Sequence, residues 1–451
     1  MKKQLIKPRT LKGFRDFLPA AMMPREKLME TARRVYRSYG YAPIDTPALE
    51  YLEILTGKGS EETDRQMYHF IDHGKRAVGM RFDLTVPLAR FVSQHIEALG
   101  TPFKRYHIGT VWRGENSQAG RYREFAQCDF DTIGTTSIAS DVECALVIND
   151  LLRALGFEAF TIRINNRKVL NGVLEKFDLL DKSAEVLRAI DKIEKAGREK
   201  VTEELRNCGA SDQQIGQILQ LVDIKGNDSE VLSQLKELVA GNELAQQGWE
   251  ELAQMSELVQ QAGVPQQNYR FDPSIARGLD YYTGVVFETT LDDDPGIGSV
   301  CSGGRYDNLA ELYTKRELPG IGASLGLDRL LAAMERLDMI PSVSTPADVM
   351  IVNFDKEFLG KYLALASRLR NAGFGVEVFC DNKKPGQQFK YADKKGFKAC
   401  IVAGGDEFDS ATVQLKWLSD GQQSEVSYDA ANGSDDAVKE LVNALRQRIE
   451  A

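Results

Sequence analysis

The alternation of hydrophobic and polar positions is most informative in residues 113–131. An apolar run ends at Trp112, a polar loop that contains glycines follows at 114–120, and an extended pattern then resumes. Successive side chains of a strand point to opposite faces. One face of this second strand is mainly apolar and consists of Tyr122, Ala126, Cys128 and Phe130. The pattern therefore predicts a sharp hairpin of two strands.

The opposite face of the second strand is graded in charge. Its side chains run from cations through an aromatic ring and an amide to carboxylates: Arg121, Arg123, Phe125, Gln127, Asp129 and Asp131. Such a face suits a bipolar ligand that has phosphates at the arginine end, a flat base against the ring and an amine at the acid end. An ordinary hairpin with a polar outer face is the alternative interpretation.

Two later regions have different periodicities. Helical spacing, with opposite charges four positions apart, runs through residues 170–262 and predicts an inserted helical domain. After a linker rich in Pro and Ser at 341–346, strand patterns alternate with helix patterns, which predicts a small α/β domain. We expect its strands at 349–354, 375–380 and 399–403, and its helices at 357–372, 385–395 and 436–450.

Composition and charge narrow the function classes. The chain has 451 residues, enough for two or three domains. Its formal net charge of −9 gives no general attraction for nucleic acid, so phosphate binding would need a local basic patch. The six cysteines are scattered without C-x-x-C spacing, and no segment has the length and apolar character of a membrane span. We therefore expect a cytoplasmic protein with no membrane partner and no metal held by its own side chains.

Asp83 and Thr85 form a further candidate cluster. They lie two residues apart on one side of a strand-like segment. Together they can accept hydrogen bonds from an ammonium group and hold it in place. Alternatively, they form an N-cap pair for the helix predicted at 87–97.

Three glycine-containing segments carry other candidate contacts. Residues 277–284 offer the guanidinium of Arg277 for a carboxylate or phosphate, and the hydroxyls of Tyr281 and Tyr282. Paired glycines in 302–307 allow a ligand to approach the backbone closely. A glycine-rich strand at 320–329 leads into a helix whose N-terminus, with Arg329, can hold a phosphate. Its spacing matches neither the Walker nor the Rossmann motif.

Taken together, these segments resemble the class II aminoacyl-tRNA synthetases, and among them the histidyl-tRNA synthetase family. The resemblance covers nearly the whole chain. The segments similar to the family's opening segment, dimer-forming motif 1, motif 2 and motif 3 are, in this order, 13–19, 40–47, 113–131 and 320–329. Residues 277–284 and 302–307 resemble the two histidine-specific signatures, which are the specific part of the match.

The resemblance implies a fold and an activity. The fold is an α+β catalytic core, with an antiparallel sheet flanked by helices, plus a helical insertion domain and a C-terminal α/β anticodon-binding domain. The implied bounds are 1–168 and 266–340 for the two parts of the core, 169–265 for the insertion and 346–451 for the anticodon-binding domain. The family acts as a homodimer. It joins L-histidine to ATP, giving histidyl-adenylate and pyrophosphate, and then transfers histidyl to the 3′ end of tRNA(His).

The resemblance also implies roles in binding ATP. Arg113 would hold the α-phosphate, while Arg121 and Arg329 would hold the γ-phosphate end. Phe125 would stack on the adenine, and Glu115 would accept a hydrogen bond from its amino group. Mg²⁺ would be bound through the ATP phosphates. The implied catalytic residues are Arg113, Arg277 and Arg329.

For histidine, the implied contacts come from three parts of the chain. Asp83, Thr85 and Gln127 would hold the amino and carboxylate groups, and Arg277 would reach the carboxylate and the α-phosphate. The imidazole nitrogens would be bound by Asp131 and Tyr282, in a pocket that Tyr281 also lines. Some family members carry Glu where this chain has Asp83 and Asp131, and the shorter side chain draws the carboxylate back toward the backbone.

Two sets of residues would contact tRNA. Gln118, in the motif 2 loop, would meet the acceptor end. Lys383, Lys384 and Lys390 belong to a lysine-rich stretch of the C-terminal domain that can bind tRNA phosphates. A solvated helix face is the alternative interpretation of these lysines.

Two other functions occur among similar proteins. One is a catalytically silent relative that regulates histidine biosynthesis by binding the ATP phosphoribosyltransferase, and the other is a sensor of uncharged tRNA. Such relatives tend to lose catalytic residues, the anticodon domain or the histidine pocket. Here Arg113, Arg277 and Arg329 are all present.

Overall fold

The computed structural model describes residues 5–56, 61–116, 120–276, 282–340, 343–381, 383–431 and 435–449. The chain divides into two compact units. The first comprises Met1–Asp16 and Arg25–Met339, and the second comprises Phe17–Pro24 and Ile340–Ala451.

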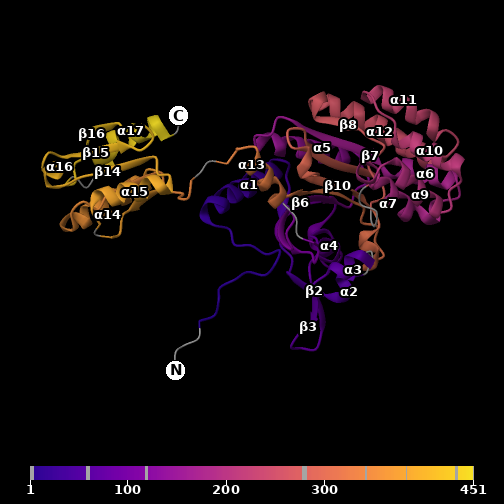
Figure 1. Cartoon of the computed structure of the whole chain (residues 1–451), viewed down its shortest axis with the longest axis horizontal. Helices are drawn as coiled ribbons and strands as arrows, with labels where there is room; N and C mark the ends of the chain where they lie inside the picture. The colour runs from indigo at the N-terminus through magenta and orange to yellow at the C-terminus, as the bar shows by residue number, and fades with distance from the viewer. Residues whose placement is uncertain are drawn as a thin grey trace. The chain divides into compact units, whose positions relative to one another are not determined.

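A large sheet forms the centre of the first unit (Figure 1). Its strands are β1 (Ala42–Pro43), β5 (Phe103–Trp112), β6 (Glu124–Ile133), β7 (Phe160–Asn166), β8 (Tyr269–Phe271), β9 (Val285–Leu291), β10 (Cys301–Tyr306) and β11 (Gly320–Gly326). Within the described residues the sheet has eight strands in the order β1-β5-β6-β11-β10-β9-β7-β8. Every neighbouring pair is antiparallel except at the two edges, where β1 and β8 run parallel to their neighbours. The predicted antiparallel core is thus confirmed, with a parallel strand added at each edge.

Strands β5 and β6 are the hairpin predicted from the alternation. Its register pairs Arg105 with Asp131, His107 with Asp129 and Gly109 with Gln127. Paired residues of neighbouring strands share a face of the sheet. The graded face of β6 is therefore extended by an arginine and a histidine from β5.

Helices pack against the large sheet of the first unit. Those outside the helical region are α1 (Pro19–Ser38), α2 (Leu52–Thr56), α3 (Glu61–Gln66), α4 (Thr85–Leu99), α5 (Ile138–Ala154) and α13 (Leu327–Arg336). Helix α1 packs on β6, where the Tyr36 hydroxyl donates to the Cys128 carbonyl at 2.9 Å. Helix α4 buries Leu88 and Val92 against residues of β6 and β10. The start of α4 is thus held close to the sheet, and the start of α13 is held against β6 by the hydrogen bond from the Ala126 backbone nitrogen to Asp328 Oδ2 at 2.8 Å.

A small second sheet projects from the first unit (Figure 1). It consists of β2 (Leu49–Tyr51), β4 (Ala77–Met80) and β3 (His69–Ile71), in that order. Four large apolar side chains on β2 and β3 are exposed: Leu49, Tyr51, Phe70 and Ile71. An exposed group of this kind is typical of a surface that another molecule covers.

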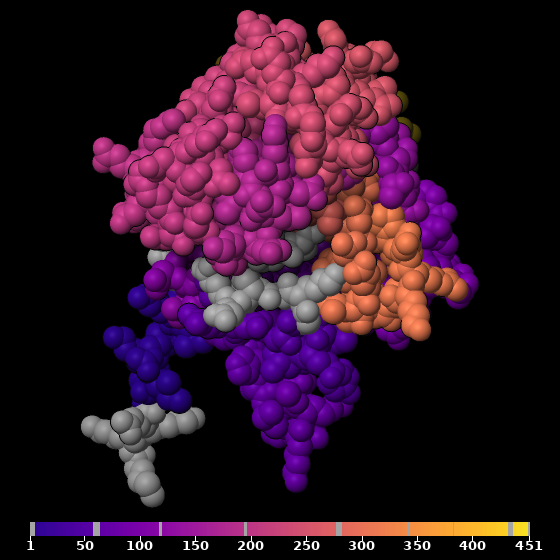
Figure 2. All heavy atoms as spheres, turned by 90° about the vertical axis from the view of Figure 1, so that its right-hand side faces the viewer, coloured from indigo at the N-terminus to yellow at the C-terminus, as the bar shows by residue number. Residues whose placement is uncertain are grey.

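The region predicted to be helical is helical, and it belongs to the same compact unit as the large sheet. Its helices are α6 (Arg167–Lys176), α7 (Ser183–Asp191), α8 (Ile193–Ala196), α9 (Arg198–Asn207), α10 (Asp212–Val222), α11 (Asp228–Val239) and α12 (Glu243–Gln261). Figure 2 shows them as one continuous mass of side chains. Helices α6 and α12 approach closely, since a Cβ at Gly172 would lie 2.4 Å from the Ala245 backbone nitrogen and one at Gly248 would lie 2.8 Å from that of Val169. Glycine is required at both crossings.

The second unit is an α/β domain. Its strands are β12 (Val349–Ile351), β13 (Val376–Val378), β14 (Ala399–Val402), β15 (Thr412–Trp417) and β16 (Gln423–Ser427). Its helices are α14 (Leu359–Asn371), α15 (Pro385–Lys395), α16 (Gly405–Asp409) and α17 (Lys439–Ile449). In the described residues the sheet order is β13-β12-β14-β15-β16. The predicted alternation of strands and helices is confirmed, and the antiparallel hairpin β15–β16 is an addition that the sequence analysis missed.

Candidate active site

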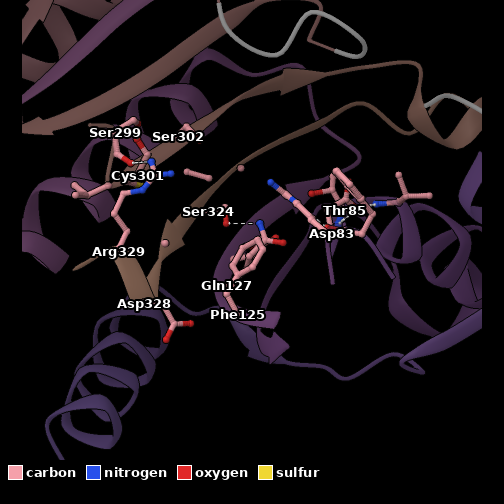
Figure 3. A pocket seen from close by; sticks show the side chains of 18 of the residues that line it. Asp83, Thr85, Phe125, Gln127, Ser299, Cys301, Ser302, Ser324, Asp328 and Arg329 are labelled. Atoms are coloured by element: carbon pink, nitrogen blue, oxygen red, sulfur yellow. Dashed lines mark hydrogen bonds between the residues drawn. The ribbon is translucent and has the colours of Figure 1, made fainter. Parts of the chain in front are cut away.

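A pocket of about 420 Å³ lies over β6, β10 and β11, beside the starts of α4 and α13 (Figure 3). Predicted site residues from distant segments of the chain line it: Asp83, Thr85, Arg113, Glu115, Arg121, Phe125, Gln127, Asp131, Tyr282 and Arg329. Three others, Gln118, Arg277 and Tyr281, lie outside the described residues. The fold thus gathers the described candidates for small-molecule binding into one cavity.

The pocket has two ends of opposite charge. We call the part lined by Asp83, Asp129 and Asp131 the acid end, and the part lined by Arg113, Arg121 and Arg329 the cation end. In Figure 3, Asp83 and Thr85 lie on one side, Arg329 lies on the other beside Ser299, and Phe125 and Gln127 lie between them. The charge gradient predicted for one strand thus extends to residues of other elements, although two carboxylates, Glu115 and Asp328, also line the part that holds the arginines.

Asp83 has a structural contact as well as a place in the pocket. Its Oδ1 accepts hydrogen bonds from the backbone nitrogens of Thr85 at 3.1 Å and Val86 at 2.9 Å, which are the first two residues of α4. The predicted N-cap pair is therefore wrong in detail, because the N-cap residue is Leu84 and Thr85 is the first residue of the helix. Asp83 nevertheless bonds to the start of the helix from one position before the N-cap. Because the same carboxylate also lines the pocket, its position is set before any ligand arrives.

Asp131 is buried and held from two sides. Its Oδ2 lies 2.7 Å from the Arg105 guanidinium, which is fully buried, and its Oδ1 accepts a hydrogen bond from the Tyr306 hydroxyl. Burial raises the pKa of this carboxyl, whereas Arg105 and Tyr306 act in the opposite direction. A Cβ at Gly322 would lie 2.2 Å from Asp131 Oδ1, so glycine on the neighbouring strand leaves the space that this carboxylate occupies.

Gln127 and Asp129 carry unused acceptor atoms. Gln127 Nε2 donates to Ser324 Oγ at 2.7 Å, while Gln127 Oε1 and Asp129 Oδ1 have no hydrogen-bond partner among the described residues. Burial raises the pKa of Asp129 to about 7. Burial, together with Arg105, lowers the pKa of the paired His107 to about 4, so this histidine is neutral at pH 7. Buried acceptors that point into a cavity are suited to ligand donors.

At the cation end, Arg113 is held most firmly. Its Nε donates to the Phe82 carbonyl at 3.0 Å, and its guanidinium carbon lies 4.4 Å from the Phe82 ring centre and 5.1 Å from that of Phe125. Arg121 lies 3.5 Å from the Glu115 carboxylate, with 41% of its side chain exposed. Arg329, in the first turn of α13, donates to the Ser299 carbonyl.

Several residues at the pocket were missed as functional candidates. Arg105, Tyr306, Ser324 and Asp328 contact predicted residues or line the cavity. A signal for Arg105 was available, because a hairpin that pairs Trp112 with Glu124 also pairs Arg105 with Asp131. The other three contact β6 from β10, β11 and α13, and no pattern within one stretch of sequence shows that these elements are neighbours.

The predicted tRNA-contacting lysines lie in the second unit. Lys383, Lys384 and Lys390 are exposed, at or just before α15, and we call them the lysine surface. Lys383 Nζ lies 3.0 Å from Asp381, with about half of its side chain exposed. The three side chains are therefore available to solvent or to an anionic partner.

The described residues lack two features of other site types. They contain no group of three or more His, Cys, Asp or Glu side chains arranged to hold a metal ion. None of the helices in the described part of the chain is long and apolar enough to cross a membrane.

The sequence matches two family models. Residues 13–330 match the model of histidyl-tRNA synthetase, and residues 348–433 match that of the anticodon binding domain.

Curated proteins are similar over nearly the whole chain. The histidine–tRNA ligase of Rhodopirellula baltica is 59% identical over 441 residues, which cover 98% of this chain and 99% of the relative. That of Wolinella succinogenes is 46% identical over 427 residues, which cover 94% and 97%. The crystal structure of histidyl-tRNA synthetase from Nostoc sp. PCC 7120 superimposes with a TM-score of 0.87 at 35% identity, covering 98% of this chain and 100% of that one.

Proposed function

This chain belongs to the histidyl-tRNA synthetase family, and from that premise we propose that it activates L-histidine with ATP and transfers histidyl to the 3′ end of tRNA(His). The observation that carries this proposal is the high identity to curated histidine–tRNA ligases over both the catalytic and the C-terminal segments. It supports an ATP-dependent aminoacyl-tRNA ligase and not the alternative of a silent regulator of histidine biosynthesis.

The cation end would bind ATP. Arg113 would contact the α-phosphate, where negative charge grows as the histidine carboxylate attacks and pyrophosphate leaves, and a fixed donor at such a point stabilises the transition state. Its place between two aromatic rings supports this role, because the guanidinium is already oriented. Arg121 and Arg329 would hold the γ-phosphate end, and Phe125 and Glu115 would bind the adenine ring and its amino group.

Mg²⁺ would enter with the nucleotide. It prefers oxygen ligands and commonly binds through substrate phosphates with few protein contacts. Glu115, a carboxylate at the cation end, lies 3.5 Å from Arg121, and the other carboxylate there, Asp328, is paired with Arg15. Neither is therefore a free ligand for the metal. The metal would neutralise charge on the phosphates of ATP.

The acid end would bind histidine. Asp83 and Thr85 would hold the amino group, with Gln127 turned toward the amino and carboxylate groups. Asp131 would face the imidazole, assisted by Tyr282, and its carboxylate is already oriented by Arg105 and Tyr306. Arg277 and Tyr281, outside the described residues, would complete the site by contacting the carboxylate and lining the pocket. Buried polar groups that are matched to imidazole would be left unpaired by other amino acids, which gives the selectivity.

The C-terminal unit would bind tRNA. Its similarity to the anticodon binding domain supports this role, and the lysine surface would contribute phosphate contacts. Gln118, outside the described residues, would meet the acceptor end. We assign residues 1–168 and 266–340 to the catalytic core, 169–265 to the helical insertion and 346–451 to the anticodon-binding domain.

The protein would act as a homodimer in the cytoplasm. The segment 40–47 resembles the family's dimer-forming motif, and the nearby sheet exposes Leu49, Tyr51, Phe70 and Ile71. Burying such side chains against a second copy would remove apolar area from water, which is worth about 25 cal/mol for each Å². Sedimentation at micromolar concentration tests this assembly, and a monomer would refute it.

Amino-acid-dependent exchange of pyrophosphate into ATP tests the proposed activity. Each standard amino acid is supplied without tRNA. Exchange with histidine alone is expected, because adenylate formation precedes transfer. Folded protein that shows exchange with no amino acid would contradict the proposal and favour a sensor of uncharged tRNA.

A further inference from the structure

Behind the cation end lies a partly buried cluster of charged side chains that none of the proposed contacts uses. Its centre is Asp328, which is 2% exposed. Asp328 Oδ1 accepts a hydrogen bond from Arg15 at 2.7 Å and lies 3.6 Å from Arg25 Nε. Its Oδ2 accepts from the backbone nitrogen of Ala126 at 2.8 Å. One carboxylate thus joins the opening segment, α1, β6 and α13.

The chain neighbours of these residues are the proposed ATP contacts. Asp328 precedes Arg329, and Ala126 follows Phe125. A carboxylate that bonds to the backbone beside Phe125, and is itself next to Arg329, fixes the spacing between the adenine platform and a γ-phosphate cation. Figure 3 shows Asp328 and Arg329 on the same side of Phe125.

Arg15 extends the same cluster to the third ATP contact. Its NH1 donates to the Tyr122 hydroxyl at 3.0 Å, and its guanidinium carbon lies 4.0 Å from the centre of that ring. Tyr122 directly follows Arg121. The opening segment adds a backbone bond, in which Arg123 N donates to the Gly13 carbonyl at 2.8 Å.

A purely local explanation accounts for part of this arrangement. An acidic residue in the first turn of a helix is favoured by the partial positive charge of the helix N-terminus, and this applies to Asp328 in α13. It does not account for Arg15, which reaches the same carboxylate from a segment 313 residues away in the sequence. Nor does it account for the stacking of Arg15 on Tyr122.

We propose that Arg15 and Asp328 are positioning residues for ATP, which together hold Arg121, Phe125 and Arg329 at the separations that the nucleotide requires. This inference rests on the proposed function, because it presumes that the cation end binds ATP. The pair acts through neighbouring residues, since small displacements of phosphate-binding groups are costly to binding and rate. The acid end has its own supports in Arg105 and Tyr306 and is independent of this pair.

The test separates the two substrates. Pyrophosphate exchange is measured at varied ATP with saturating histidine, and at varied histidine with saturating ATP, for the unaltered protein, Arg15→Ala, Arg15→Lys and Asp328→Asn. We expect Arg15→Ala to raise KM for ATP at least about tenfold, which corresponds to about 1.4 kcal/mol, and to change KM for histidine by less than about twofold. Arg15→Lys should have a smaller effect, because lysine keeps the charge but lacks the planar group that bonds and stacks at once.

A matched control removes a different, partly buried ion pair. Asp272 pairs with Arg163 at 2.8 Å and does not line the pocket. Asp272→Asn should lower the melting temperature without changing either KM. An unchanged KM for ATP in folded Arg15→Ala, or equal rises in both KM values, would overturn the inference. If Arg15→Ala does not fold, the same criteria apply to Arg15→Lys: a KM for ATP that is unchanged, or that rises equally with KM for histidine, overturns the inference.

The unaltered protein shows whether a negative result contradicts the proposed function or only the positioning role. If it shows no histidine-dependent exchange, the proposed function is wrong. If its exchange is normal and the variants keep its KM for ATP, only the positioning role is wrong.

Discussion

Charge is arranged differently in the pocket of the first unit and on the lysine surface of the second. At the acid end of the pocket, Asp131 is nearly fully buried and pairs with Arg105, which is fully buried and does not itself line the pocket. Lys383 has half of its side chain in solvent. Charges interact several times more strongly where water is excluded, and salt screens exposed ones. The pocket is therefore built for chemistry at fixed positions, and the lysine surface for salt-sensitive attraction.

Removal of Arg113 should have the largest effect. Arg113→Ala is expected to lower the rate of histidine-dependent pyrophosphate exchange about 10²- to 10³-fold, the range typical for loss of one oriented donor at a transition-state charge. The control is Lys383→Ala, which removes the same charge from the lysine surface. It should leave exchange without tRNA unchanged, and an equal loss in both variants would break the comparison.

Asp131→Asn should have the next largest effect. An Asn side chain keeps the shape but leaves the buried Arg105 without an ionic partner and weakens the proposed contact to imidazole. Hydrogen bonds to charged groups contribute about 1.5–3 kcal/mol, so KM for histidine should rise about ten- to hundredfold while KM for ATP changes little. Steady-state exchange at varied concentrations of each substrate measures both. A rise confined to KM for ATP would contradict the assignment of histidine to the acid end.

The buried acids predict how stability depends on pH. The pKa of Asp129 is raised to about 7, mainly by burial, whereas an unfolded Asp titrates near 4. Between these values the native state holds a proton that the unfolded chain has lost, so this group lowers the free energy of unfolding as pH rises. Asp129→Asn should remove that decline, by up to about 1.4 kcal/mol per pH unit, as measured by urea unfolding from pH 4 to 7.

Asp272→Asn supplies the opposite case, for which urea unfolding is measured from neutral pH to below the unfolded pKa of about 4. Burial raises the pKa of Asp272, but Arg163 and Ser274 outweigh it and the net direction is downward. Its contribution to stability is therefore present above the pKa of the unfolded chain and is lost as pH falls. The two variants should change the pH dependence in opposite directions, and a common direction would refute the assigned environments.

The lysine surface should give the smallest effects. Lys383→Ala, Lys384→Ala and Lys390→Ala should each weaken tRNA binding severalfold and reduce the slope of log affinity against log salt by about one unit. Fluorescence titration at several salt concentrations measures both quantities. Lys439→Ala removes an exposed lysine of α17, outside the lysine surface, and should leave tRNA affinity and its salt dependence unchanged. Slopes that stay at the value of the unaltered protein would favour the solvated-face interpretation.

Local patterns predicted much of the fold because they reflect how one element buries one face. The β5–β6 hairpin, the helices of 167–261 and the alternating elements of the second unit were all visible in this way. The hairpin β15–β16 also had a signal, since Val413, Leu415 and Trp417 alternate with less buried residues, but its short strands were overlooked. The resemblance to a known family supplied the roles of candidate residues, which no periodicity contains.

The sequence by itself determined which chemical groups were available: the graded strand, the glycine-rich segments, the scattered arginines and the lysines near 390. Only the tertiary structure decided which of them meet. Asp131 is set by Arg105 across the hairpin and by Tyr306 from a strand 175 residues away. Asp328 accepts a hydrogen bond from Arg15 of the opening segment. Such contacts depend on strand register and on the packing of the whole sheet, which are fixed by the summed burial of many side chains rather than by any one stretch of sequence.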